Sequence, residues 1–279
     1  MKLFLRKILK WWCSVVKVRG RHKLANKLGN IIQPKGGKDH VTIGKIVLPI
    51  DHSIPMYRYV YYGIYEEDFV SFLKRTLKPG DVVIEPGANV GYVTAIMSEL
   101  VGERGLVISL EPSRNCFSMI EKYLTEKNIH LLNKALYNEI TTKKFVDKPN
   151  VVRTGYSAFN DYTGAKEGDE VYDIETTTVK QLALDFNTKR IAFLKLDIEG
   201  AELPAIQGCG DLLEKKQIDY ILVETNFIKG HAEINATIQQ IMERNGYIPY
   251  LPGRKSIRKV NLNELDGKRL DIIWSHIAV

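Results

Sequence analysis

The sequence predicts an α/β protein with a doubly wound, mostly parallel sheet. From residue 41 onward, short apolar runs rich in β-branched residues alternate with segments of helical periodicity. Such alternation is typical of parallel strands with helices on both faces of the sheet. The first strongly apolar run of the main domain also ends in a glycine-containing turn, at residues 85–91, that leads directly into a helix. Open α/β sheets bind their ligands at turns of this kind.

The elements follow from these runs in chain order. Each expected strand is a short run dominated by Val, Ile and Leu, and each expected helix repeats its apolar residues at about 3.6-residue spacing. The strands are expected at residues 82–84, 106–110, 130–132, 192–196 and 220–223, and the helices at 67–77, 92–100, 114–127, 204–215 and 236–245. Residues 141–178 break this rhythm, and their strand-like segments 143–146 and 171–177 indicate an insertion over the carboxyl edge of the sheet.

The chain divides into three regions. Residues 1–40 form a basic amphipathic extension, residues 41–78 hold lead-in strands and a helix that covers the ligand site, and residues 79–279 form the main domain. The 279 residues include 44% hydrophobic and 26% charged residues, which excludes wholesale disorder. No apolar run has the length of a membrane-spanning helix. The cysteines Cys13, Cys116 and Cys209 are too far apart for a disulfide framework or a zinc site, and they fit a reducing cytoplasm.

The net charge of +7 is concentrated at the N-terminus. Residues 1–38 contain eleven of the 40 Lys and Arg residues and none of the 33 Asp and Glu residues. The remaining body is therefore mildly acidic, and no nucleic acid partner is expected. Within residues 1–17 an apolar face opposes a basic one, which suits either peripheral contact of residues 1–23 with the inner, anionic membrane face or docking on the domain. A cleaved signal peptide is not expected, because Arg6, Lys7 and Lys10 interrupt the apolar run.

The glycine turn carries the first chemical signal. Gly87 permits a tight turn and close approach of a ligand, and Gly91 lets the start of the helix pack against the strand. Glycines alone are a weak signal, because any βα unit can need them for packing. Glu85 at the strand tip would repel a pyrophosphate and attract a cation. S-adenosylmethionine carries an ammonium and a sulfonium and no phosphate, so Glu85 favours it over NAD or FAD.

Two further strands end in acidic residues at the same edge. Glu111 follows the second strand at the position, about twenty residues after the glycines, where nucleotide-binding units place an acid for the ribose hydroxyls. The alternative is that Glu111 caps the next helix. Asp197 lies at the tip of the strand 192–196, with Glu199 and Glu202 close behind. These acids could hold a divalent metal, but no histidine joins them and Glu202 suits a first helical turn, so no metal is expected.

Several of these segments resemble the ordered motifs of the FkbM-like S-adenosylmethionine-dependent methyltransferases. The resemblance extends over about residues 60–225 and is carried by residues 65–66, 80–92, 110–112, 135–136 and 195–202. It implies the Rossmann-like class I methyltransferase fold, whose seven-stranded sheet has an antiparallel last strand, here 270–274. It also implies O-methylation of a hydroxyl on a sugar, polyketide or related glycoconjugate.

The resemblance further implies which residues bind the cofactor. They are Glu85, Gly87, Ala88, Asn89 and Gly91 at the methionine and ribose end, Glu111 at the ribose, Asn133 to Ala135 near the adenine, and Tyr65 and Glu66, which close the pocket. The family usually has Asp-Val at the position of Glu85 and Pro86. In this chain the carboxylate reaches one methylene further, and the proline removes an amide donor.

A sugar hydroxyl needs a base near its proton. Asp197 is the first candidate because its strand tip would face the methyl group, and the alternative is that it caps the following helix or hydrogen-bonds the loop. Weaker candidates are Glu199, Glu224 at the end of the strand 220–223, and His231 in the loop after it. The sequence therefore predicts an O-methyltransferase with a small-molecule or glycan acceptor. The alternatives are an N- or RNA methyltransferase, or a non-catalytic cofactor-binding or membrane-associated protein of the same fold.

Overall fold

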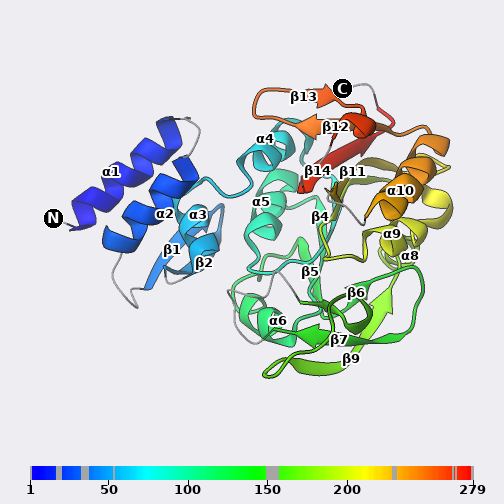
Figure 1. Cartoon of the computed structure of the whole chain (residues 1–279), viewed down its shortest axis with the longest axis horizontal. Helices are drawn as coiled ribbons and strands as arrows, with labels where there is room; N and C mark the ends of the chain where they lie inside the picture. The colour runs from blue at the N-terminus through cyan, green and yellow to red at the C-terminus, as the bar shows by residue number, and fades with distance from the viewer. Residues whose placement is uncertain are drawn as a thin grey trace.

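The N-terminal fifth of the chain forms a separate lobe beside a larger α/β body (Figure 1). The computed structural model describes residues 2–16, 21–32, 38–52, 54–148, 157–227, 231–265, 267 and 269–277. Within these residues, no helix has the length and hydrophobicity needed to cross a membrane.

The central sheet of the body has the order β13-β12-β14-β11-β10-β3-β4-β5 within the described ranges. Its strands are β3 (Val82–Pro86), β4 (Leu106–Leu110), β5 (Ile129–Leu132), β10 (Ile191–Leu196), β11 (Ile218–Asn226), β12 (Ile248–Pro252), β13 (Ile257–Lys259) and β14 (Arg269–Ser275). The neighbouring strands β5, β4, β3, β10 and β11 run parallel to one another. Strand β14 lies between β11 and β12 and is antiparallel to both. This confirms the predicted doubly wound sheet with an antiparallel last strand. The six strands named from the sequence are present. Strand β12, which was not predicted, is the seventh, and β13 extends the sheet at its edge by pairing with β12.

Helices cover both faces of this sheet (Figure 1). Successive strand residues point to opposite faces, so Val83 packs with one core and Ile84 with the other. The first core includes α4 (Glu67–Thr76), α5 (Tyr92–Val101) and α6 (Arg114–Ile120), and the second includes α8 (Val179–Asp185), α9 (Glu202–Gln207) and α10 (Ala232–Arg244). Because the parallel strands all end at one edge, the loops that follow them surround a common site.

The helices differ from the prediction at several places. Helix α6 ends at Ile120 rather than at residue 127, and the chain then turns so that Leu124 is buried. The segment 204–215 is split into α9 and the 3-10 turn η2 (Gly210–Leu212). Gly208 lies at the split, and a Cβ there would lie 2.4 Å from the Tyr137 carbonyl oxygen, so the position is restricted to glycine. Helix α8 was not predicted.

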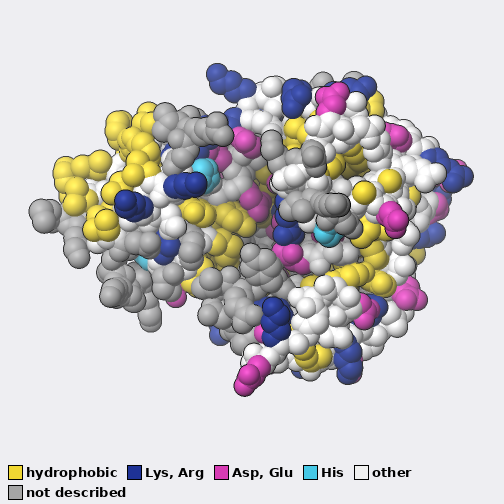
Figure 2. Space-filling view, in the orientation of Figure 1, with side chains coloured by type: hydrophobic (Ala, Val, Ile, Leu, Met, Phe, Trp, Pro, Cys, Tyr) yellow, Lys and Arg dark blue, Asp and Glu magenta, His cyan; other side chains and the backbone are white. Residues whose placement is uncertain are grey.

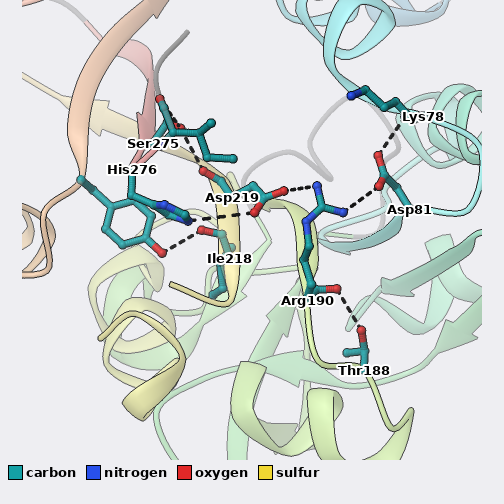
Figure 3. A network of polar contacts seen from close by, with 10 residues as sticks. Lys78, Asp81, Thr188, Arg190, Ile218, Asp219, Ser275 and His276 are labelled. Carbon is teal, nitrogen blue, oxygen red and sulfur yellow. Dashed lines mark hydrogen bonds and ion pairs between the residues drawn. The ribbon is translucent and has the colours of Figure 1, made fainter. Parts of the chain in front are cut away.

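Arg190 ties the strands together at their amino ends, away from the site (Figure 3). Its guanidinium binds Asp81 at 3.0 Å, just before β3, and also the carboxylate of Asp219 in β11. The other Asp81 oxygen accepts the Lys78 amide at 2.8 Å. Arg190 itself precedes β10, so one side chain links three neighbouring strands.

The predicted insertion forms a second sheet in the order β6-β9-β7-β8. Its strands are β6 (Ala135–Leu136), β7 (Thr142–Asp147), β8 (Ala158–Phe159) and β9 (Glu170–Thr177). The short helix α7 (Asn160–Thr163) directly follows β8 in the chain. Strands β7 and β9 confirm the two segments predicted there. Residues 149–156 of the insertion lie outside the described residues.

The N-terminal lobe consists of α1 (Lys2–Val15), α2 (Arg21–Ile32), the hairpin of β1 (Lys38–Ile43) with β2 (Ile46–Asp51), and α3 (Pro55–Tyr62). The helix predicted within residues 1–17 is confirmed, whereas α2 and α3 were not predicted. Leu9 and Cys13 bury one side of α1 in a core that continues into the body. The buried Arg21 connects lobe and body, because it donates to the Cys13 carbonyl at 2.9 Å and pairs with Glu67 of α4.

Candidate active site

A cavity of about 550 Å³ opens at the carboxyl ends of β3, β4, β10 and β11. A cavity of this volume is typical of small-molecule and cofactor sites. The insertion contributes Phe145 and Phe159 to its wall, and the start of α3 contributes Met56 together with the preceding Ile54. Figure 2 shows acidic side chains along the hollow between lobe and body. The insertion and the N-terminal lobe therefore both contribute to the cavity at the predicted carboxyl edge of the sheet.

The glycine turn forms the floor of this cavity. The amides of Gly87 and Ala88 both donate to the Leu110 carbonyl, at 2.7 and 3.0 Å. Gly87 has a φ of +81°, and a Cβ there would lie 3.1 Å from the Asp197 carbonyl oxygen, so no other residue fits easily. Gly91 begins α5 with a φ of +73° but does not line the cavity. A Cβ at Gly91 would meet Leu124 at 2.9 Å, so its close contact is with the segment after α6 rather than with the strand.

Glu85 is fully buried at the tip of β3 and lines the cavity. One of its carboxyl oxygens accepts hydrogen bonds from the hydroxyls of Thr94 at 2.5 Å and Ser109 at 3.1 Å. Burial raises the pKa of Glu85 to about 8, although these bonds and Lys195 favour the charged form. At neutral pH Glu85 is therefore mostly protonated until a cation approaches it.

Glu111 is buried at the tip of β4 and lines the same cavity. Its two carboxyl oxygens accept the amides of Asn89 at 2.6 Å and Ser113 at 2.8 Å. Each oxygen keeps a lone pair for a further donor, as a ribose would supply. Burial raises the pKa of Glu111 to about 7. The cap of α6 is Ser113, whose hydroxyl accepts the Cys116 amide at 3.1 Å, so Glu111 is not the helix cap.

Two predicted residues near the adenine differ in their placement. Ala135 lines the cavity, together with Lys134. Asn133 does not line it; its side-chain amide donates to the Glu111 carbonyl at 2.7 Å. Asn133 therefore holds the backbone of the Glu111 turn in place.

Tyr65 and Glu66 line the cavity from the start of α4. The ring of Tyr65 meets that of Tyr92 edge to face, with centroids 5.7 Å apart. Glu66 has a φ of +46°, a strained conformation for a residue with a side chain. Its Oε2 is buried and has no hydrogen-bond partner among the residues that the structure describes, and burial raises the pKa of the Glu66 carboxyl. A buried acceptor without a partner is costly unless a ligand satisfies it.

Asp197 lies at the tip of β10 beside the buried ammonium of Lys195, at 2.8 Å. Burial by itself would raise the pKa of Asp197, but Lys195 outweighs it and the pKa is lowered. Glu224 shows the opposite behaviour, because burial and the charge of Asp197 raise its pKa to about 9 despite its ion pair with Arg269. At neutral pH Asp197 is therefore ionised and Glu224 protonated.

The structure brings three of the four candidate bases together. Carboxyl oxygens of Asp197, Glu199 and Glu224 lie within 4.8 Å of one another, and all three residues line the cavity. Arg269 pairs with Glu199 at 2.9 Å, so cations of the protein already neutralise part of this cluster. His231 is exposed at the start of α10 and does not line the cavity.

Sequence reasoning missed three charged residues of this site, Lys195, Arg269 and Asp271. Asp271 lines the cavity, and burial raises its pKa to about 7. Lys195 and Asp271 had a visible signal, because each interrupts a strand that is otherwise mostly apolar. Glu202 serves the loop instead, since its carboxylate accepts the amides of Ile198 and Gly200, both at 3.0 Å.

Residues 85–249 match the family model of the methyltransferase FkbM domain, which is more than half of the chain. No curated protein sequence matches the chain significantly. Among solved structures, the chain is similar to a putative rRNA methylase from Clostridium thermocellum, with 14% identity over 75% of this chain and 94% of that one and a TM-score of 0.45. It is also similar to an O-methyltransferase from Bacillus cereus in complex with SAH, with 10% identity over 98% of both chains and a TM-score of 0.41. These structural likenesses are too distant to carry an inference about the acceptor.

Proposed function

The chain belongs to the FkbM family of S-adenosylmethionine-dependent methyltransferases, and we propose that its acceptor is a hydroxyl of a sugar, a glycoconjugate or a related natural product. The observation that supports this acceptor is the ionised carboxylate of Asp197 at the cavity wall, held in place by Lys195. A hydroxyl is a poor nucleophile at neutral pH, so a fixed base beside its proton is useful. An acceptor that is already nucleophilic has less need of one.

The cavity suits a cationic donor. The carboxyl groups of Glu66, Glu85 and Glu111 line it, and all three are buried. The free Oε2 of Glu66 is available to accept a hydrogen bond from the ammonium of the methionine end. Each carboxyl oxygen of Glu111 has a lone pair left for a hydrogen bond donated by a ribose hydroxyl. When bound, S-adenosylmethionine supplies a methyl group on a positively charged sulfur.

The residues of the chain then have separate tasks. Gly87 lets the floor of the cavity approach the ligand closely, while Tyr65 and Tyr92 exclude water from one side. Asp197 accepts the proton of the acceptor hydroxyl as the oxygen attacks. Glu224, protonated and hydrogen-bonded to Asp197, fixes the orientation of that carboxylate. Its own proton prevents it from acting as the base at neutral pH.

An amine acceptor is the second candidate, because a cluster of carboxylates would also attract an ammonium group. The acidic side chains that line the cavity disfavour RNA, whose phosphates they would repel. The two candidates differ in their need for a base. We expect Asp197→Asn to abolish most O-methylation, whereas transfer to a neutral amine would be less affected.

The experiment measures transfer of a labelled methyl group from S-adenosylmethionine to a panel of acceptors. The panel contains glycosides and glycolipid headgroups, primary amines and tRNA. We expect label in the hydroxyl-bearing acceptors and a loss of about a hundredfold in Asp197→Asn. Asp185→Asn at the end of α8 is the matched control and should retain full turnover. Label in amines or RNA alone, or cofactor binding without any transfer, would contradict the proposal.

A further inference from the structure

The N-terminal lobe carries an apolar surface that the body leaves uncovered. On α1 the side chains of Phe4, Ile8, Trp11 and Val15 are 67%, 44%, 63% and 56% exposed. Their spacing of four, three and four residues places them in one stripe along the helix. Leu9 and Cys13 on a different side of α1 are buried. Docking of α1 on the lobe therefore buries other residues, and the side chains of this stripe remain largely exposed.

Helix α2 continues the surface. Leu24, Leu28 and Ile31 are 42%, 37% and 62% exposed, and their spacing of four and three residues again forms one stripe. Helices α1 and α2 pack against each other within the lobe. Figure 2 shows hydrophobic side chains gathered over this part of the molecule. Exposed apolar surface of this extent is typical of an interaction site rather than of a free surface.

The charges beside the stripes have one sign. Lys7, Lys10, Lys23 and Lys27 are exposed, and each directly precedes an exposed apolar residue of its helix. Neither helix contains an acidic residue. A cation at the flank of an apolar stripe can contact a lipid phosphate while the stripe enters the acyl region.

We propose that α1 and α2 bind the surface of an anionic lipid bilayer. Charge complementarity selects this occupant over a second copy of the chain. In a symmetric dimer the same patch faces itself, so the lysines of both copies would be brought together and would repel. An anionic bilayer offers both an apolar layer and negative charge, and Trp11 suits its interface.

A groove beside the stripes extends the same surface. Its volume is about 660 Å³, and Trp11, Lys7 and Lys10 of α1 line it together with apolar residues of α5 such as Ile96 and Leu100. The apolar surface of α1 thus continues from the outside of the lobe into the space between lobe and body. This continuity favours an occupant with flexible apolar chains, such as a lipid.

Attachment would also have a consequence for the acceptor. Met56 of α3, which is part of the lobe, and the preceding Ile54 line the cavity of the candidate active site. A bilayer bound by α1 and α2 would hold this cavity near the membrane and favour lipid-linked acceptors. This consequence, unlike the attachment itself, rests on the proposed function.

The test is flotation of the full chain with vesicles of phosphatidylcholine alone and of phosphatidylcholine mixed with phosphatidylglycerol. We expect binding to the mixed vesicles that weakens with salt, because salt screens the lysines. The double substitution Ile8→Ser with Trp11→Ser should reduce the partition coefficient by at least about tenfold. Lys7→Glu with Lys23→Glu should abolish the preference for anionic vesicles.

The matched control changes two equally exposed apolar residues of the body. Ile140 and Leu184 are 65% and 64% exposed, so Ile140→Ser with Leu184→Ser removes similar apolar surface and should leave binding unchanged. Unchanged S-adenosylmethionine affinity in every variant shows that the body remains folded, independently of the acceptor. The proposal is wrong if the wild type does not float, if the control loses binding equally, or if the Ile8 and Trp11 variant instead dissociates a dimer.

Discussion

The pKa of Glu85 predicts that S-adenosylmethionine binding releases protons, and that the substitution Glu85→Gln removes most of this release. Glu85 is buried, and its pKa of about 8 means that it is mostly protonated in the free protein at pH 7. A cation bound nearby favours the carboxylate and lowers this pKa. Glutamine has nearly the same shape, and its carbonyl can still accept the hydrogen bonds of Thr94 and Ser109.

The magnitude follows from the two protonation states. With a pKa of about 8, about nine-tenths of Glu85 carries a proton at pH 7, so complete ionisation in the complex releases about 0.9 proton. Glu111, with a pKa of about 7, adds about half a proton in both the wild type and the variant. Because the raised pKa of Glu85 makes binding release a proton, the affinity for S-adenosylmethionine should increase as the pH rises toward 8. The amino group of the ligand titrates equally in both proteins and cancels in the difference.

The assay is titration calorimetry at pH 7 in two buffers with different protonation enthalpies. The slope of the observed enthalpy against the buffer enthalpy gives the number of protons released. We expect the wild type to release about 0.9 proton more than Glu85→Gln. Equal proton release in both proteins, with affinity intact, would refute the placement of the cationic end of the ligand beside Glu85.

Other substitutions separate catalysis, binding and stability. Asp197→Asn should reduce turnover by about a hundredfold while the cofactor affinity is retained. Glu224→Gln should reduce turnover much less, because Glu224 is already protonated. If steady-state assays give the reverse order, Glu224 rather than Asp197 is the base. Glu111→Ala should weaken S-adenosylmethionine binding at least about tenfold by calorimetry, and unchanged affinity would exclude a ribose contact. Arg190→Ala should lower the free energy of unfolding by about 1–2 kcal/mol, since the buried carboxylates of Asp81 and Asp219 lose the guanidinium that both of them contact. Lys189→Ala is its control and should leave thermal unfolding unchanged.

The parts of the fold that the sequence predicts are those where burial repeats regularly. The runs that became β4 and β10 are mostly apolar, and nearly all of their residues are buried. Helix α3 begins with Pro55 and is then dominated by tyrosines, which give no clear amphipathic period. Helix α2 has apolar residues on both its buried and its exposed sides, so its pattern resembles neither a surface helix nor a core helix.

The candidate site was predictable to the extent that strand tips determine it. Glu85, Glu111 and Asp197 follow predicted strands, and the topology places them at one edge. The side-chain pairing was not predictable, because contacts such as Arg269 with Glu224 join residues 45 positions apart on antiparallel strands. Closeness in sequence is no better guide to the site, because His231 is only seven residues from Glu224 and yet lies outside the cavity.

The buried carboxyl groups at the cavity reveal a conflict between stability and binding. Glu85 has a folded-state pKa of about 8 against 4.5 when unfolded, so its contribution to stability is complete below pH 4.5 and declines as the pH rises to about 8. At pH 7 the ligand-free fold must therefore take up a proton there, at a cost on the order of 3 kcal/mol. A glutamine would avoid this cost, and so would a hydrophobic residue. Glu66 adds an unsatisfied buried oxygen in a strained backbone conformation. Under the proposed function, a cationic ligand would favour the carboxylate of Glu85 and donate a hydrogen bond to Glu66, which would account for acids that the fold alone does not favour.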